Sequence, residues 1–182
     1  SVRRGDKWGI INNQGKEVVA LKYDQITNVV FGISTVTLNK KQGIIDTTGR
    51  VIIQNKYQSL SYFSPETQLA RFDRTSGKKH YSGYLNRKGK EVISSRKYHI
   101  DTGSLFSEGL LAARLRRGTQ YGYLNTKGET IIPFRFKNLG NFRQGIARII
   151  VNKKMKVKKN GYDLVKYVKR YGLIKNPLQK KK

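Results

Sequence analysis

The chain has 182 residues, a length that fits one domain or a short array of repeats. Its 38 Lys and Arg residues outnumber the 11 Asp and Glu residues, and the net charge of +27 excludes an acidic or charge-balanced protein. Because 37% of the residues are hydrophobic and none is Cys, we expect a folded chain without disulfides, thiolate zinc sites or cysteine nucleophiles. Two His residues are too few for a multi-histidine metal centre, so no metal and no cofactor is predicted.

The N-terminal segment, residues 1–4, does not begin with Met, so we interpret the chain as a fragment or a processed form. No apolar run reaches the roughly 20 residues that a membrane-spanning helix needs, so no transmembrane segment is predicted. A chain without Cys is compatible with either redox compartment, and composition therefore leaves the location open.

From residue 8 onward the chain repeats one pattern four times: two glycines six residues apart, with apolar residues on both sides. The first glycines are Gly9, Gly43, Gly83 and Gly122, and the second are Gly15, Gly49, Gly89 and Gly128. Three residues before each second glycine stands Asn or Asp, which is typical of a type I turn. Because glycine readily adopts the positive φ of a hairpin bulge, each copy predicts a β-hairpin.

Two aromatic residues follow each hairpin, and we predict that they form core layers rather than a ligand cage. They are Tyr23 and Phe31, Tyr57 and Phe63, Tyr98 and Phe106, and Phe136 and Phe142. A third strand follows the second aromatic, and no segment has convincing helical periodicity. We therefore predict an all-β fold of about four to five three-stranded antiparallel units, stacked as an open solenoid-like array, with a closed propeller-like ring as the alternative.

The predicted organisation is a single β domain over residues 1–178, with repeats near 7–40, 41–80, 81–119 and 120–150. A fifth copy at 171–178 breaks off early, and we interpret it as a cap or as a strand that completes the last unit. Residues 179–182 are predicted to form a disordered basic tail.

The repeated segments resemble the bacterial WG-repeat (KWG-repeat) family. Its units read Trp-Gly, an apolar or aromatic pair, Asp or Asn, two variable residues, Gly, Lys, and an apolar pair leading to Tyr. Residues 7–16 fit this pattern best, and Lys90, Pro133 and residues 106–112 also match. The resemblance implies a β-repeat architecture and a bacterial cell-envelope or secreted location, with a cytoplasmic one as the alternative, and it carries no catalytic constellation. The chain departs from the family in keeping only one Trp, Trp8, and in a long basic insert.

Candidate catalytic residues are few. Glu17, Glu91 and Glu129 follow the turn glycines, and we interpret them as cross-strand partners or solvated hairpin ends rather than as a catalytic row. His80 and His99 have no Asp, Ser or Cys at a spacing typical of a catalytic pair, so a structural role is predicted for both. We therefore predict that the chain is not an enzyme, and an enzyme of unknown class is the third hypothesis.

Turn geometry and packing do not account for the positive charge, which increases toward the C-terminus. Residues 1–91 contain 16 basic and 7 acidic residues, whereas residues 92–182 contain 22 and 4. Residues 151–170 form a basic insert, predicted to be a hairpin with its turn at Asn160-Gly161 and with Lys154, Lys156 and Lys158 on one strand face. Because excess charge repels itself in a compact state, we infer that it attracts an anionic surface. Protection of strand edges and a compositional bias are the alternatives.

The leading functional hypothesis is a non-enzymatic scaffold or binding module that docks a partner protein or an anionic envelope polymer through a basic C-terminal face. The alternative is a nucleic-acid-binding protein that places the same lysines on phosphates and the intervening tyrosines on bases. The predicted partner-binding residues are Lys153, Lys154, Lys156, Lys158, Lys159, Lys166, Lys169 and Arg170, with a second cluster of Arg114, Arg116 and Arg117. No oligomeric state is predicted.

Overall fold

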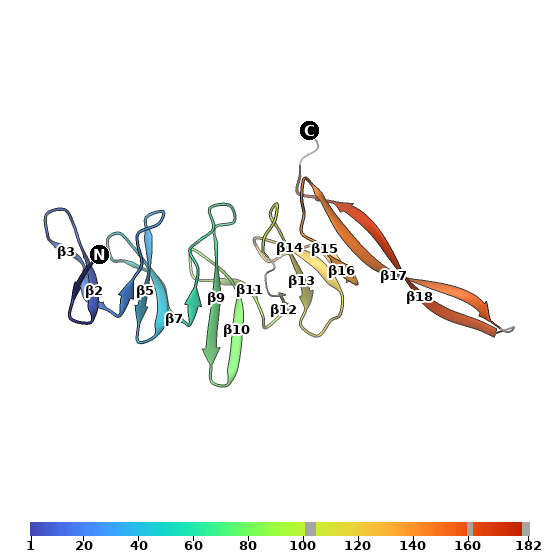
Figure 1. The fold of residues 1–182 in the computed structure, drawn as a ribbon, viewed down its shortest axis with the longest axis horizontal. Helices are drawn as coiled ribbons and strands as arrows, with labels where there is room; N and C mark the ends of the chain where they lie inside the picture. Colours follow the sequence, from blue (N-terminus) through green and yellow to red (C-terminus); the bar gives the residue numbers. More distant parts are fainter. Residues whose placement is uncertain (101–104, 160–161, 180–182) are drawn as a thin grey trace. The chain divides into compact units, whose positions relative to one another are not determined.

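The computed structural model describes residues 1–100, 105–159 and 162–179, and within these residues it contains strands and turns but no helix. The chain divides into two compact units, Ser1–Ser94 and Ser95–Lys182. Each unit consists of small antiparallel sheets in which strands that follow one another in sequence lie side by side (Figure 1). The prediction of an all-β repeat array is confirmed. The described residues form several small antiparallel sheets, and none of these sheets closes into a barrel.

The first unit contains three sheets, each formed by consecutive strands. The first sheet comprises β1 (Val2–Arg4), β2 (Lys7–Ile11) and β3 (Glu17–Tyr23). The second comprises β4 (Gln25–Ile26), β5 (Ile33–Leu38), β6 (Lys41–Asp46) and β7 (Val51–Tyr57). The third comprises β8 (Ser59–Leu60), β9 (Leu69–Ser76), β10 (Lys79–Asn86) and β11 (Glu91–Ser94).

The second unit contains two sheets. One comprises β12 (Tyr98–His99), β13 (Leu110–Leu115), β14 (Tyr121–Asn125) and β15 (Thr130–Phe136). The other comprises β16 (Asn138–Leu139) and two strands of 14 residues, β17 (Ile146–Lys159) and β18 (Tyr162–Lys175).

The turns follow the predicted chemistry in all four copies. In the second copy the Asp46 carboxylate accepts hydrogen bonds from the backbone N–H groups of Thr48 and Arg50, each 3.0 Å long. The equivalent side-chain oxygens of Asn12, Asn86 and Asn125 accept the same pair of bonds. The second glycine of the pattern has a positive φ, for example 85° at Gly49, a region that disfavours a residue with a Cβ atom. Side chain and glycine together therefore determine where each hairpin reverses.

The sheets are out of phase with the sequence repeats. Strands β4 and β5 belong to the first copy, but they pair within one sheet with the Gly43–Gly49 hairpin of the second copy. The same register recurs along the chain, because the third strand of one copy always lies opposite the first glycine of the next: Val36 with Gly43, Phe72 with Gly83, Ala113 with Gly122, and Ile149 with Gly172. Consecutive repeats are thus joined by backbone hydrogen bonds as well as by packing.

Two details differ from the predicted three-stranded unit. The three middle sheets have a fourth strand of two residues, which begins at the buried aromatic or two residues after it and is too short to be recognised as a strand from the sequence. The fifth copy completes the last sheet, since Gly172 and Lys175 of β18 pair with β17 as earlier copies pair with their predecessors. Of the predicted tail, Gln179 hydrogen-bonds to Glu108, and residues 180–182 lie outside the described residues.

Neighbouring sheets within a unit pack face to face and bury the apolar pair of each motif. In β6, Ile45 packs with Val19 and Tyr23 of the first sheet, whereas Ile44 packs with Phe72 and Leu85 of the third. Adjacent residues of a strand point to opposite faces, so a sheet with neighbours on both sides needs an apolar pair rather than a single apolar residue. In the second unit Leu110, Tyr123, Phe142 and Ala147 form the equivalent core.

Most of the predicted core aromatics are buried, but Phe31 is not. Its side chain is 71% exposed and its φ is +49°. Phe31 precedes Gly32 as Glu108 precedes Gly109, and both residues lie in the tight turn before the third strand. The structural equivalent of Phe142 in the first copy is therefore Val29, and the sequence alignment of this aromatic was wrong by two residues.

Two buried tyrosines differ in hydrogen bonding, and this difference gives a testable prediction. The Tyr57 hydroxyl is buried without a hydrogen-bond partner in the described residues, whereas the Tyr123 hydroxyl donates to the Gly140 carbonyl. Burial raises the pKa of both phenols. We expect Tyr57→Phe to leave the free energy of unfolding unchanged or to raise it by up to about 1 kcal/mol, and Tyr123→Phe to lower it by about 1–2 kcal/mol. Denaturant titrations measure both changes, and an equal loss in the two variants would contradict the assignment.

Candidate functional site

The basic insert forms the outer part of the β17–β18 hairpin, which projects beyond the other strands of its sheet (Figure 1). In the second sheet the β5–β6 ladder extends only two residue pairs beyond Gly43 toward the turn, to Leu38 opposite Lys41. The β17–β18 ladder continues past Gly172 as far as Lys159 opposite Tyr162. The insert therefore lengthens a hairpin that every copy contains, and the predicted turn residues, Asn160 and Gly161, lie outside the described residues.

The register of this hairpin sorts the predicted partner-binding residues between its two faces. Lys154, Lys156 and Lys158 alternate along β17, and the residues opposite them on β18 are Tyr167, Val165 and Asp163. Since residues directly opposite each other in a ladder share a face, one face carries a set that we call the lysine–tyrosine face. Its members are Lys154, Lys156, Lys158, Tyr167, Lys169 and Tyr171.

The other predicted residues of the insert do not join this face. Lys153 and Arg170 lie on the opposite face, which continues the apolar surface of Ile149 and Val151. Lys159 and Lys166 belong to the strands, but their side chains are outside the described residues. The single basic face inferred from composition thus consists, in the structure, of two faces with different surroundings.

The lysine–tyrosine face is uncovered because no further sheet follows it in the described residues. Leu173 has the same place in its sheet as Tyr123 in the preceding one, where the following sheet buries the ring. Leu173 is instead 70% exposed, and Tyr171 and Tyr167 are 72% and 65% exposed. Strand β18 is also the edge of its sheet, so no described strand shields its tyrosines from the side.

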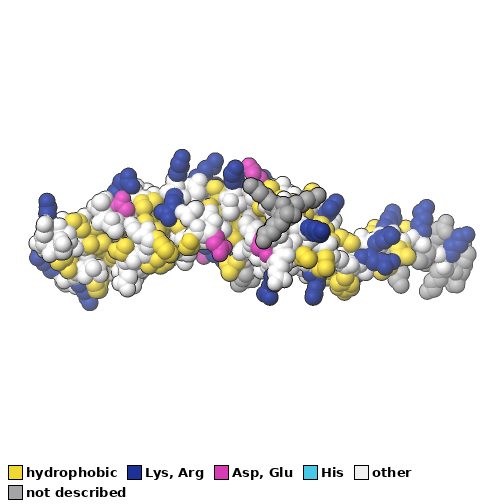
Figure 2. All heavy atoms as spheres, turned by 90° about the horizontal axis from the view of Figure 1, so that it is seen from above, with side chains coloured by type: hydrophobic (Ala, Val, Ile, Leu, Met, Phe, Trp, Pro, Cys, Tyr) yellow, Lys and Arg dark blue, Asp and Glu magenta, His cyan; other side chains and the backbone are white. Residues whose placement is uncertain are grey.

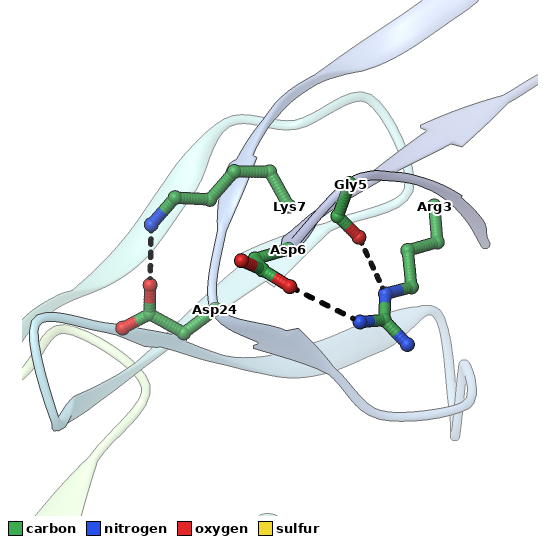
Figure 3. A network of polar contacts seen from close by, with 5 residues as sticks. All are labelled: Arg3, Gly5, Asp6, Lys7 and Asp24. Atoms are coloured by element: carbon green, nitrogen blue, oxygen red, sulfur yellow. Dashed lines mark hydrogen bonds and ion pairs between the residues drawn. The ribbon is translucent and has the colours of Figure 1, made fainter.

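Charge on this face is not compensated by the described acidic side chains. In the first sheet Lys7 bonds to Asp24 at 2.6 Å and Arg3 bonds to Asp6 at 3.3 Å (Figure 3). The hydrogen bond from Lys7 lowers the pKa of Asp24. By contrast, Asp163 is the one acidic residue between 146 and 175, and its side chain lies outside the described residues. In the space-filling view, Lys and Arg side chains lie over all the sheets and along the projecting hairpin (Figure 2).

Two hollows of the second unit are lined by basic residues. One, of about 620 Å³, is lined by Arg96, Lys97, Leu115, Arg116 and Arg117, and the backbone N–H of Arg116 donates to the carbonyl of Lys97. Arg114, predicted in the same cluster, does not line it and donates to the carbonyl of Gly118 at 2.9 Å. The second hollow, of about 490 Å³, lies at the base of the β17–β18 hairpin and is lined by Asn138, Leu139, Gly140, Asn141, Arg143, Arg148 and Ile150.

Comparison with protein families agrees with the repeat pattern. A family described as a WG containing repeat matches residues 8–41, 43–72 and 121–154, which together make up more than half of the chain. The chain belongs to the WG-repeat family. No curated protein and no solved structure matches it.

The WG repeats themselves account for part of the positive charge, a point that the sequence analysis missed. A basic residue precedes the buried aromatic in every copy, and its charge lies over that ring at 5.1–5.4 Å. These pairs are Lys22 and Tyr23, Lys56 and Tyr57, Lys97 and Tyr98, and Arg135 and Phe136. Such cation–π contacts are structural, and the recurring basic–aromatic dipeptide is the signal that identifies them.

Glu91, Glu129 and His80, which were candidates for catalysis, have structural contacts. Glu91 forms a largely buried ion pair with Arg74 at 2.9 Å, and Glu129 accepts a hydrogen bond from Asn125. His80 lies 3.3 Å from Asp73, a partner that spacing in the sequence does not indicate, because the pairing of β9 and β10 brings the two residues together. No group of three His, Asp or Glu side chains in the described part of the chain is placed to hold a metal ion. Nor does this part contain a helix that could span a membrane.

Proposed function

We propose that this WG-repeat chain is a non-catalytic binding module that docks an anionic partner through the lysine–tyrosine face. The observation that carries the proposal is the placement of Lys154, Lys156, Lys158 and Lys169 on one uncovered sheet face without an acidic partner among the described side chains. Partners consistent with this charge include the acidic protein or envelope polymer expected from the sequence.

The repeats support this role by holding the hairpin. The base of β17 contributes Ala147, Ile149 and Val151 to the core that also contains Leu110 and Tyr123. Because this opposite face is packed at the base, the lysine–tyrosine face keeps a defined orientation relative to its own unit. A scaffold of this kind limits the conformational entropy that is lost when a partner binds.

The test compares two variants of equal net charge. Replacing Lys154, Lys156, Lys158 and Lys169 with Gln is expected to weaken binding to polyphosphate, an anionic polymer without rings or apolar groups, by tenfold or more at moderate salt. The control replaces Lys78, Lys79, Lys88 and Lys90 with Gln, four residues that are exposed in the first unit. Their loss is expected to change the affinity by about threefold or less, because exposed charges beyond a Debye length of about 8 Å are screened.

The affinities are measured by fluorescence anisotropy with labelled polyphosphate at several salt concentrations. If the two variants lose the same affinity, binding follows the overall net charge and the lysine–tyrosine face is not the docking surface.

A further inference from the structure

We infer that the anionic partner of the lysine–tyrosine face is a single-stranded nucleic acid. This inference rests on the proposed function and names the chemical class of its ligand. Lysine charge alone would suit any polyanion, but the side chains between and beside these lysines suit a nucleic acid in particular.

Exposed aromatic rings alternate with the positive charges. Tyr167, Lys169 and Tyr171 are successive residues on this face of β18, and Lys154 lies directly opposite Tyr167. Side chains on the same face of a strand are about 7 Å apart, so each ring has an ammonium group within the reach of one nucleotide. A ring with a π-face open to solvent and flanked by cations is the arrangement on which unpaired bases stack while their phosphates are neutralised.

The position of Tyr171 is partly covered in the preceding sheet, so the full exposure of this ring is specific to the last sheet. Tyr121 occupies the position of Tyr171 in the preceding sheet, where it is half-buried and lies opposite Phe136 of β15. Because β18 is followed by no such strand in the described residues, the ring of Tyr171 is left open. The core of the second unit extends along β17 only as far as Val151, and Tyr167 lies farther out on the hairpin, opposite Lys154. Tyr171 lies at the base of the projecting part, opposite Ile150.

At its base the lysine–tyrosine face leads into the hollow of about 490 Å³. Asn138 lies opposite Ile150, and Ile150 lies opposite Tyr171, so the hollow and the tyrosine belong to one row across the sheet. Arg143 and Arg148 supply guanidinium donors for phosphate, and the amides of Asn138 and Asn141 can donate to and accept from a base edge. A duplex keeps its bases stacked inside, whereas a single strand can place one base in this hollow.

A second copy of the chain fits this face poorly. The chain carries a net charge of +27, so two copies would bring like charges together. An acidic protein surface would use the lysines and would also bury the apolar side chain of Leu173, which is exposed on the same face. This difference between Leu173 and the tyrosines separates the protein and nucleic-acid alternatives in an experiment.

The experiment measures the affinity of the full chain for a labelled oligodeoxythymidine of about 12 nucleotides, a length within the usual site sizes. Replacing both Tyr167 and Tyr171 with Ala is expected to weaken binding by about 100-fold, because each lost stacking contact corresponds to roughly a tenfold change. The variant with Phe at both positions should bind within about twofold of the unmodified chain. Replacing the four lysines with Gln should make the log–log salt slope less negative by about 3.

Three controls make the outcome decisive. Leu173→Ala should change oligonucleotide affinity by less than about twofold. The variant with Ala at both tyrosines should bind polyphosphate, and a duplex of the same length, nearly as well as the unmodified chain does.

If the tyrosine change weakens polyphosphate and oligonucleotide binding equally, or weakens neither, the nucleic-acid inference is overturned while the proposed function stands. If Leu173→Ala weakens binding as much as the tyrosine change, the face is an apolar protein-binding surface instead. Insensitivity of polyphosphate binding to the lysine change refutes the proposed function itself.

Discussion

Replacing Gly43 with Ala is expected to lower the free energy of unfolding of the first unit by about 3 kcal/mol. A Cβ atom at this position would lie 2.5 Å from the carbonyl oxygen of Ile53, which belongs to the neighbouring strand β7. The β6–β7 ladder shifts register at this point, between Gln42 and Ile44, and the bulge brings the two backbones together. Because backbone atoms cannot move aside as a flexible side chain can, the hairpin itself must open.

Trp8, the single Trp of the chain, lies against the core of the first unit and reports its unfolding by fluorescence in a guanidinium titration. The control is Gly15→Ala, where no atom lies within 4 Å of the added Cβ and the only penalty is the φ of +77°. We expect a loss of about 1–2 kcal/mol there, and a smaller loss for Gly15→Asn, because Asn tolerates the left-handed region. A smaller effect at Gly43 than at Gly15 would show that the close approach of the strands is not what requires glycine.

Glu108→Ala is expected to destabilise the second unit by about 2–3 kcal/mol, since the Glu108 carboxylate accepts hydrogen bonds from three residues, Gly145, Asn176 and Gln179. The backbone N–H of Gly145 and the side chain of Gln179 donate to it at 3.0 and 3.1 Å. Asn176, which is buried, donates to the backbone carbonyl of Glu108 at 3.0 Å. Removing the carboxylate leaves buried donors without an acceptor and releases the C-terminal segment that packs there.

The change is measured by circular dichroism during guanidinium unfolding, and Trp8 fluorescence should remain at its unmodified midpoint. Two variants serve as controls. Glu108→Gln keeps one acceptor oxygen and is expected to lose less stability. Gln144→Ala changes an exposed residue with nearly the same φ, +50° against +51°, and is expected to alter stability by about 0.5 kcal/mol or less. Equal losses in Glu108→Ala and Gln144→Ala would show that the turn conformation, and not the carboxylate, is responsible.

Much of the fold could be predicted because its information is local. The Asn or Asp and the second glycine of each copy determine a turn within a few residues, and the structure shows the predicted hydrogen bonds at Asp46 and its equivalents. The role of the first glycine could not be predicted in this way. Gly43 is required by its approach to Ile53, and that approach depends on a bulge that appears only when β6 and β7 are paired.

The candidate site could be predicted in part. Alternation along a strand places Lys154, Lys156 and Lys158 together, and the register confirms it. Lys153 and Arg170 were grouped with the others by charge density, which does not distinguish the two faces of a strand. The exposure of Tyr167 and Tyr171 cannot be predicted from local sequence, since it depends on which sheets have a neighbour.

The amino-acid sequence by itself determined the all-β class, the number and position of the hairpin reversals, and membership of a repeat family. These follow from side-chain capping and backbone conformational preferences that act over a few residues. Only the tertiary structure decided that sheets combine strands from consecutive copies, and that the last sheet leaves one face uncovered. Both depend on pairing and packing between residues far apart in the chain, where local preference carries no information about the partner.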